Sequence, residues 1–312
     1  MKLPKYIFLN GEYVEYSDAK IHVLSTANKF AAVVYEGIRG YWSDEHEELY
    51  IFRHKEHMER LFRSMKICRM ENPYSYEKYR GILLNLIKKC ELREDIHVRQ
   101  QSLVMADNGS ISSTGPIGVM IAPVPMGRYF GGEKKGVDVC VSSWRRITDI
   151  ALPPRIKCTG NYANSRLSSI QAKEDGYDEA ILLTPEGYVS EGSMANLFVI
   201  KDGVPITPRS TDSILEGITR ATIIELFKRE HNLDVVQRPV ERTELYTADE
   251  AFFCGSGAEI VPILSIDRHK LVNTGEQSLT QAIHDTYSRV VTAQNPSYSE
   301  WLTPVYGSEQ AS

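Results

Sequence analysis

The sequence has no long hydrophobic run and few cysteines, and each shortage excludes a class of protein. No stretch of the 312 residues approaches the roughly 20 apolar residues that a membrane-spanning helix needs. The five cysteines are scattered and none stands in a CxxC pair, which predicts neither a disulfide framework nor a zinc knuckle. The first residues, MKLPKY, contain no apolar signal core. We therefore expect a cytoplasmic protein.

The sequence also lacks a strong excess of either charge. Its 36 Lys and Arg residues face 41 Asp and Glu residues, a net charge of -5, which gives no sign of a nucleic acid or an anionic membrane as partner. Hydrophobic residues make up 42% and charged residues 25%, as in globular proteins. The length allows two domains that each bury a core.

One stretch separates the chain into two parts. Residues 123–132, PVPMGRYFGG, are rich in proline and glycine and show no hydrophobic period, which is typical of a linker. We therefore predict a small N-terminal domain at 1–122, an interdomain loop at 123–135 and a larger domain at 136–312. Strands and amphipathic helices are predicted in both parts, so the fold class is α/β, with two α+β domains.

Local patterns predict several elements before the linker. Asn10-Gly11 between two short apolar runs indicates a β-hairpin. Apolar residues recur every three or four positions after Arg53 and again after Ser75, which predicts two helices, the second capped by Ser75. His54 and His57 fall on the first of these helices among charged residues, so we expect them to face solvent and not to bind a metal.

The chemistry is concentrated in residues 153–200. This stretch contains Lys157 between apolar and small residues, Tyr162 five positions later, and Glu191 on a short connection between predicted strands. An amine, a phenol and a carboxylate each have a use if the ligand is a pyridine that carries an aldehyde. The amine forms a Schiff base, the phenol contacts the ring hydroxyl and the carboxylate contacts the ring nitrogen.

Two motifs of this stretch resemble the signature sequences of the class IV aminotransferases. They are KCTGNYAN at 157–164 and SEGSMANLF at 190–198. The resemblance extends over nearly the whole chain, from FLNG at 8–11 to about Asp267, and is closest to the branched-chain amino acid aminotransferases. It implies pyridoxal phosphate fold type IV, the fold of D-amino acid aminotransferase, with pyridoxal 5'-phosphate as cofactor.

The resemblance also implies roles for individual residues toward this cofactor. Lys157 is the catalytic residue, which holds the cofactor as an internal aldimine and then moves the proton of the substrate. Glu191 matches the partner of the ring nitrogen and Tyr162 the partner of the ring oxygen. The remaining cofactor residues are implied by the motifs LEGITR at 215–220 and FFCGSGAE at 252–259 and by a strand that runs into a helix: Leu215 against the ring, and Arg53, Ile218, Thr219 and Ser256 at the phosphate.

The substrate pocket is implied in the same way. Arg99 of the motif HVR matches an arginine that binds a substrate carboxylate, and Tyr129 of the predicted loop matches a tyrosine that lines the pocket. The other substrate residues implied by the resemblance are Phe30, Tyr35, Gly37, Arg39, His97, Gly257 and Ala258.

The implied reaction is transamination between a branched-chain L-amino acid and 2-oxoglutarate. Four positions around the expected pocket depart from the pattern of branched-chain enzymes: Phe30 and His97 replace tyrosines, Tyr35 replaces phenylalanine, and Ala31-Ala32 replaces a segment that begins with glycine. An (R)-selective amine or D-amino acid transaminase is therefore an alternative, and an aminodeoxychorismate lyase is a further one. The partners are a small-molecule amino donor and a 2-oxo acid acceptor, and the resemblance implies a homodimer or a larger homo-oligomer.

Overall fold

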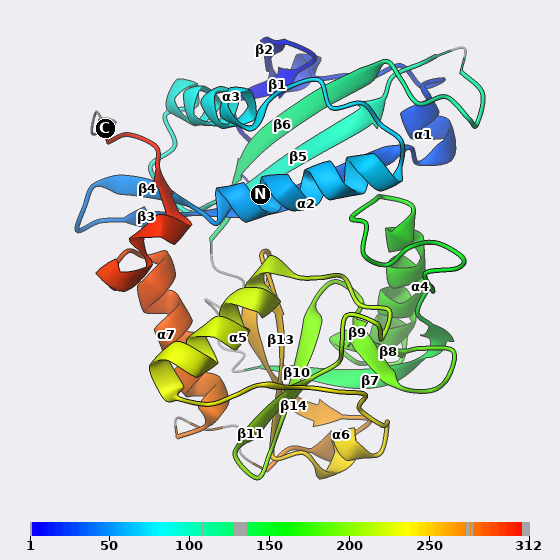
Figure 1. The fold of residues 1–312 in the computed structure, drawn as a ribbon, viewed down its shortest axis with the longest axis vertical. Helices are drawn as coiled ribbons and strands as arrows, with labels where there is room; N and C mark the ends of the chain where they lie inside the picture. Colours follow the sequence, from blue (N-terminus) through cyan, green and yellow to red (C-terminus); the bar gives the residue numbers. More distant parts are fainter. Residues whose placement is uncertain (1, 108, 128–135, 273–274, 276, 308–312) are drawn as a thin grey trace. The chain divides into compact units, whose positions relative to one another are not determined.

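The computed structural model describes residues 2–107, 109–127, 136–272, 275 and 277–307, which form two compact units (Figure 1). Of these residues, the first unit contains 2–127, 156–160 and 289–307, and the second contains 136–155 and 161–288. The segment around Lys157 and the C-terminal segment thus belong to the first unit, although the predicted domain 136–312 includes both. The reason is main-chain pairing, since both segments bond to strands of the first unit.

The first unit is built on an antiparallel sheet of seven strands in the order β16-β4-β3-β5-β6-β1-β2. The predicted hairpin is confirmed, because Asn10 and Gly11 both have the positive φ angles of a tight hairpin turn, 50° and 102°. The strands of this sheet are β1 (Tyr6–Leu9), β2 (Glu12–Glu15), β3 (Val33–Ser43), β4 (Glu48–Phe52), β5 (Ile96–Val104), β6 (Ile117–Pro125) and β16 (Leu302–Pro304).

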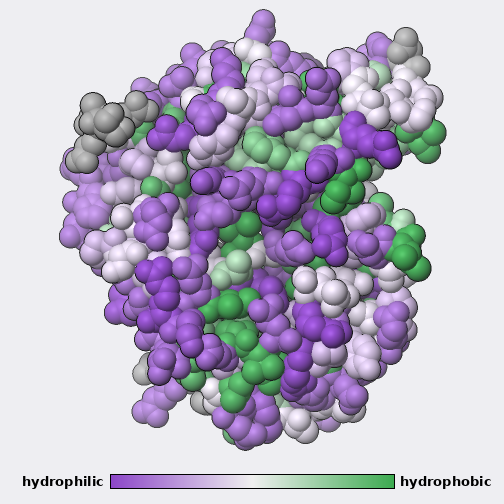
Figure 2. All heavy atoms as spheres, viewed as in Figure 1, coloured by the Kyte–Doolittle hydropathy of each residue, from purple (hydrophilic) through white to green (hydrophobic). Residues whose placement is uncertain are grey.

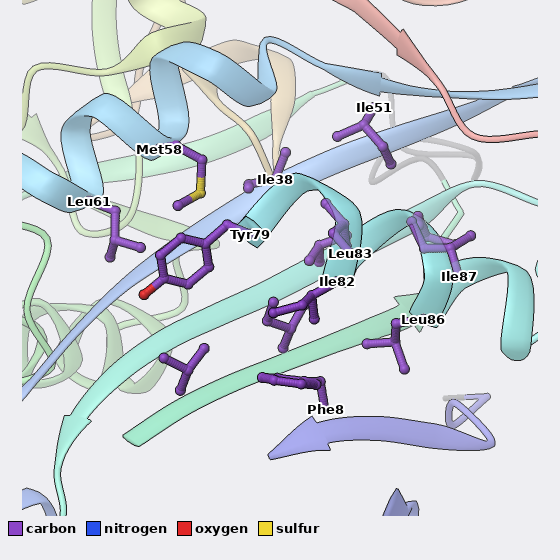
Figure 3. Packing of buried hydrophobic residues seen from close by; sticks show 14 of the residues in the cluster. Phe8, Ile38, Ile51, Met58, Leu61, Tyr79, Ile82, Leu83, Leu86 and Ile87 are labelled. Atoms are coloured by element: carbon purple, nitrogen blue, oxygen red, sulfur yellow. The ribbon is translucent and has the colours of Figure 1, made fainter. Parts of the chain in front are cut away.

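Two long helices, α2 (His54–Ile67) and α3 (Tyr76–Lys89), pack against this sheet, and a short helix, α1 (Thr26–Phe30), precedes β3. The predicted cap of α3 is confirmed, since the Ser75 hydroxyl accepts a hydrogen bond from the amide of Lys78. Figure 3 shows the core between helices and sheet, where apolar side chains of α2 and α3 meet those of the strands. Its labelled residues are Phe8, Ile38, Ile51, Met58, Leu61, Tyr79, Ile82, Leu83, Leu86 and Ile87.

The prediction that His54 and His57 face solvent is wrong. Both side chains are only 2% exposed. Nδ1 of His57 lies 2.7 Å from Oε2 of Glu36 on β3, so this face of α2 buries polar groups against partners on the sheet. Burial, with smaller contributions from His57 and Arg80, lowers the pKa of His54 to about 3.

The second unit contains a mixed sheet of nine strands. Its order is β12-β11-β10-β13-β14-β7-β8-β9, with β15 paired to β14, and the pairs β11/β12, β14/β7 and β7/β8 are parallel. The strands are β7 (Val137–Arg145), β8 (Glu179–Leu183), β9 (Val189–Gly192), β10 (Asn196–Lys201), β11 (Val204–Thr207), β12 (Val236–Gln237), β13 (Glu250–Gly255), β14 (Glu259–Ile266) and β15 (His269–Lys270).

Four helices accompany this sheet: α4 (Asn161–Glu174), α5 (Ile218–His231), α6 (Glu244–Thr247) and α7 (Leu279–Val291), the last of which ends in the first unit. The sequence pattern predicts Leu167 and Ile170 on the buried side of α4, and this is wrong, because they are 45% and 39% exposed. The helix instead buries Ser165, Ser168 and Ala172, small residues that let it lie close to its neighbours.

Helices and two sheets together agree with the predicted α/β class. Among the described residues, no helix has both the length and the apolar character that crossing a membrane requires. Hydrophilic residues cover much of the face shown in Figure 2, with smaller hydrophobic areas between them.

Candidate active site

Lys157 is held by its main chain against the first sheet. Its carbonyl oxygen accepts a hydrogen bond of 2.8 Å from the amide of Tyr35 on β3, and its own amide donates to Oγ of Ser64 on α2, at 3.3 Å. The next residue, Cys158, forms a β-bridge with Val34. A strand and a helix far away in the sequence therefore fix the backbone from which the Lys157 amine extends.

The predicted substrate residues of β3 and β5 lie on one face of this sheet. Side chains two residues apart on a strand share a face, so Tyr35, Gly37 and Arg39 point the same way. In the register of the pair, Gly37 is opposite Arg99 and Arg39 is opposite His97, which places both β5 side chains on that face as well. We call these five residues the β3/β5 row.

The Lys157 amine lies at one end of the β3/β5 row. Its Nζ is 4.8 Å from the centre of the Tyr35 ring, and the guanidinium carbon of Arg99 is 3.6 Å from the same centre. The two cations therefore lie near one aromatic ring. A carboxylate at Arg99 would have an amine close by, which is the arrangement that an amino acid substrate requires.

His97 lies between the cationic residues of the β3/β5 row and is itself neutral near pH 7. Burial lowers its pKa to about 4, and the charges of Arg39, Arg99 and Lys157 act in the same direction. The ring lies so close to Gly37 that a Cβ atom there would be 2.7 Å from Nε2 of His97, so any larger residue would force the imidazole to move. His97 thus contributes a neutral hydrogen-bonding group near pH 7.

Arg39 makes contacts that the sequence pattern did not indicate. Its guanidinium is 1% exposed and donates to the carbonyl oxygens of Met126, at 2.8 Å, and Gly127, with Asp95 3.9 Å away. Its partners include the main chain after β6, a carboxylate and the Tyr41 ring, 5.2 Å from the guanidinium carbon. Tyr129, which was predicted to line the pocket, lies outside the described residues. Phe30, also predicted for the pocket, is the last residue of α1, and its ring is exposed.

A buried charge cluster lies on the other face of β3. Glu36 is fully buried and accepts hydrogen bonds from His57, at 2.7 Å, and from Nε and Nη2 of Arg60, at 2.8 and 2.7 Å. Burial alone would raise the pKa of Glu36, but Arg60 and His57 outweigh it and lower the pKa to about 2. Glu36 is therefore ionised at neutral pH and holds the side chains of His57 and Arg60 on α2.

The phosphate arginine implied by the sequence, Arg53, has other described partners. Its guanidinium carbon lies 3.6 Å from the centre of the Trp301 ring, and Nη1 is 2.9 Å from Glu56. The Lys157 segment instead meets α2 at Ser64, one turn beyond Arg60. The sequence analysis did not identify Arg60 as a site residue. Arg60 and Ser64 are four positions apart, which places both on one face of α2.

In the second unit, Glu191 is buried on β9 and both of its oxygens are bound. Oε1 lies 2.8 Å from Nη2 of Arg146, and Oε2 accepts hydrogen bonds from Nδ2 of Asn196, at 2.8 Å, and from the amide of Leu215, at 3.1 Å. The sequence pattern predicts Glu191 on a short connection between strands, whereas it lies within the short strand β9, where its carboxylate is fixed by these bonds. Neither Arg146 nor Asn196 was identified from the sequence as a partner of Glu191.

The start of α5 adjoins this carboxylate. Gly217 is the N-cap in extended conformation and no side chain caps the helix, so main-chain amides stand at its beginning. A Cβ atom on Gly217 would collide with Oδ1 of Asn196. The Nδ2 atom of the same side chain donates a hydrogen bond to the carbonyl oxygen of Leu215. The predicted residues Leu215, Ile218 and Thr219 therefore belong to the same part of the second unit as Glu191.

Two other predicted segments belong to the second unit. Ser256, Gly257 and Ala258 form the turn between β13 and β14, and β13 pairs with β10 so that Cys254 is opposite Asn196. Tyr162 is the second residue of α4. The second unit thus contains a carboxylate, a helix N-terminus, hydroxyl groups and a phenol on neighbouring elements.

Comparison with known proteins identifies the family. The model of the family described as "Amino-transferase class IV" matches residues 33–266. The chain belongs to the class IV aminotransferases. It is 40% identical over 305 residues to a probable branched-chain-amino-acid aminotransferase of Aquifex aeolicus, which covers 96% of this chain and 97% of the relative.

Solved structures of other class IV aminotransferases share the fold. The branched-chain aminotransferase of Thermoproteus uzoniensis, solved with norvaline, has a TM-score of 0.91 and 40% identity, and the match covers 97% of this chain and 100% of that one. The enzyme of Thermobaculum terrenum in its pyridoxal phosphate form has a TM-score of 0.92 and 38% identity, with 98% and 100% covered. The predicted fold type and family are confirmed.

Class IV aminotransferases use pyridoxal 5'-phosphate, so this chain is a transaminase with that cofactor. The residues present fit the group. The amides and the Thr219 hydroxyl at the start of α5 suit a phosphate, and the helix dipole adds to their attraction. Glu191 suits a protonated ring nitrogen, and Lys157 suits an aldehyde.

Proposed function

We propose that this aminotransferase moves the amino group of a branched-chain L-amino acid to 2-oxoglutarate, which yields the branched-chain 2-oxo acid and L-glutamate. The observation that carries the proposal is the Lys157 amine beside Tyr35 and Arg99, at the end of a row that can hold a carboxylate. The names of the relatives support the substrate pair, since the similarity extends over nearly the whole chain.

The roles at the reacting atoms follow from the chemistry of each side chain. Bound pyridoxal phosphate supplies an aldehyde for the amino group and a ring that withdraws electrons. Lys157 attaches the aldehyde and accepts and returns the proton of the substrate α-carbon. Glu191 keeps the ring nitrogen protonated, and Tyr162 donates to the ring oxygen.

The proposed phosphate site of the second unit lies at the start of α5 and in the turn between β13 and β14. Ile218 and Thr219 supply amides at the start of α5, and Ser256 supplies a hydroxyl. Arg53 was predicted to add a guanidinium, but Arg60 is the better candidate, because it shares a helix face with the Ser64 hydroxyl that binds the Lys157 segment. Its two bonds to Glu36 fix the plane of the guanidinium. Leu215 would contact the ring.

Substrate recognition rests on the β3/β5 row. Arg99 binds a carboxylate and Tyr35 lines the pocket beside the amine. The neutral ring of His97 adds a hydrogen bond without adding charge. The other predicted substrate residues, Phe30, Gly37, Arg39, Tyr129, Gly257 and Ala258, belong to the proposal through the resemblance to the family.

One observation favours a second candidate function. An imidazole rather than a phenol lies across Gly37, next to Arg39 and Arg99, so the row differs in shape and hydrogen bonding from a row that carries tyrosine. An (R)-selective amine or D-amino acid transaminase is therefore the alternative activity.

The experiment is a comparison of three amino donors. The purified holoenzyme is mixed separately with L-leucine, D-alanine and (R)-1-phenylethylamine, each with 2-oxoglutarate, and the glutamate formed is quantified. We expect L-leucine to react at least tenfold faster than the other two, and Lys157→Ala to lose both the activity and the visible band of bound cofactor. Faster reaction with either of the other donors would replace the branched-chain proposal by the alternative.

We also propose that the enzyme is a homodimer or larger homo-oligomer and acts in the cytoplasm. The assembly rests on the resemblance to the family. The compartment is supported by five cysteines whose spacing suggests no disulfide framework.

A further inference from the structure

Arg146 is a buried cation next to Glu191 that the reaction described above does not use. It directly follows β7, it is 6% exposed, and its amide donates to the carbonyl oxygen of Leu183 at 2.8 Å. Its guanidinium contacts three segments of the second unit: β9, α4 and the connection between β11 and α5. Nη2 lies 2.8 Å from Oε1 of Glu191, Nη1 donates to Oγ of Ser165 on α4, and Nε donates to the carbonyl oxygen of Ser213, both at 3.3 Å.

Four other polar or titratable groups face Glu191. Asn196 and the amide of Leu215 bind its second oxygen and carry no charge. Arg220 interacts with Glu191 electrostatically, but its described hydrogen bonds go to Thr207, Pro208 and Gln237. Cys254 is fully buried; burial raises the pKa of its thiol, and the charge of Glu191 raises that pKa further.

We propose that Arg146 is a positioning residue that keeps Glu191 ionised and aimed, so that the proton between this carboxylate and the cofactor's ring nitrogen stays on the nitrogen. The inference rests on the proposed role of Glu191. A carboxylate in a buried site takes up a proton unless a cation compensates its charge, and a carboxylic acid cannot stabilise a protonated ring.

The contact with Ser165 gives Arg146 a second effect. Ser165 lies on α4, the helix whose first turn carries Tyr162. One guanidinium therefore ties the carboxylate proposed for the ring nitrogen to the helix that carries the phenol proposed for the ring oxygen. Lysine at this position would keep the charge, but it could not reach both partners in the fixed geometry of a guanidinium.

The test measures the protonation of the cofactor ring directly. Wild type, Arg146→Met, Arg146→Lys and Glu191→Gln are loaded with pyridoxal phosphate that carries ¹⁵N in the ring, and the ¹⁵N resonance is recorded. We expect the wild type to show a protonated ring, Arg146→Met to move toward the resonance of an unprotonated pyridine, and Arg146→Lys to stay close to the wild type. An unchanged resonance in Arg146→Met overturns the proposal.

Glu191→Gln separates this failure from a failure of the proposed function. If its resonance equals that of the wild type, Glu191 is not the partner of the ring nitrogen, and both ideas fall. If Glu191→Gln moves the resonance and Arg146→Met does not, only the inference about Arg146 is wrong. Arg145→Met is the matched control, because the neighbouring Arg145 is exposed, and it should leave the resonance unchanged.

The thermal midpoint of the apoprotein tests the same proposal, and it can be measured even if a variant does not retain the cofactor. Without Arg146, the fold favours the protonated Glu191, so the thermal midpoint of Arg146→Met should fall relative to the wild type as pH rises from 5 to 8. Adding Glu191→Gln should remove this pH dependence and recover part of the midpoint. A pH dependence that persists in the double variant overturns the proposal.

Discussion

Glu36 is a buried carboxylate at the centre of a polar cluster in the first unit. Its carboxylate holds His57 and Arg60 on the opposite face of β3 from the β3/β5 row, and Arg60 keeps a small exposed fraction of 4%. A buried carboxylate with this number of partners fixes side chains of a helix relative to a strand. Glu36 therefore supports the site from behind rather than touching substrate.

Replacement of Glu36 should destabilise the protein in a pH-dependent way. Glu36→Gln leaves Arg60 buried without its anion, so we expect the free energy of unfolding at pH 7 to fall by about 3–5 kcal/mol. The pKa of Glu36 is about 2 in the fold, below the ordinary value of 4.5, so its contribution is present above 4.5 and lost as pH falls toward 2.

Denaturant titrations of wild type and Glu36→Gln between pH 3 and 7 measure this difference. The gap between the two proteins should narrow below pH 4.5. Glu45→Gln, on an exposed turn, is the control and should change the unfolding free energy by less than about 0.5 kcal/mol. A gap that is constant over this pH range would argue against an ionised Glu36.

At the scale of the elements, the start of α5 depends on the contact between Gly217 and Asn196. A methyl group on Gly217 would collide with Oδ1 of Asn196, whose Nδ2 binds both Glu191 and the carbonyl oxygen of Leu215. The glycine is thus required by a close approach between a helix start and a strand, and not by its backbone angles, which are extended.

Gly217→Ala should therefore affect both stability and the cofactor. We expect a loss of about 1–3 kcal/mol in unfolding free energy from the forced displacement of Asn196, together with at least tenfold weaker binding of pyridoxal phosphate. Denaturation and fluorescence titration measure the two effects. The matched control is Gly81→Ala inside α3, where nothing lies within 4 Å of the added atom, and alanine there should be neutral or stabilising. Equal behaviour of the two variants would contradict the argument.

At the scale of the whole molecule, the first unit is completed by the end of the chain. Strand β16 pairs with β4, the Trp301 ring stacks on Arg53, and the Glu48 carboxylate accepts hydrogen bonds from the amides of Val305, Tyr306 and Gly307. Residues separated by about two hundred and fifty positions are thus neighbours in one sheet.

Deletion of residues 295–312 should loosen the first unit and leave the core of the second unchanged. We expect hydrogen exchange in peptides over β4 and the start of α2 to accelerate at least tenfold, because their partners at the chain end are removed. Peptides over β10 and β13, where Phe198 and Phe252 stack, should exchange as before. Deletion of 308–312 alone is the control. Equal acceleration in both units would show that they do not unfold separately.

Local sequence determined much of the fold and part of the site. The Asn10-Gly11 turn, the Ser75 cap and the apolar period of α2 and α3 depend on neighbouring residues, so they could be predicted. The outer face of α4 could not be predicted, because a periodic pattern of apolar residues does not distinguish an exposed leucine such as Leu167 from a buried one. The motifs around Lys157 and Glu191 identified the family, since a particular chemistry requires particular groups in order.

Only the tertiary structure decided which groups meet. Tyr35 bonds to Lys157, and Arg146 bonds to Glu191, through contacts that span 122 and 45 positions of the chain. From the sequence alone, a charged side chain such as Arg60 is expected on the surface. The tertiary structure shows that it is buried, because it binds the buried carboxylate of Glu36. Strand register and helix packing set these distances. They depend on the whole chain, which is why local patterns predicted the elements and the chemistry but not the partners.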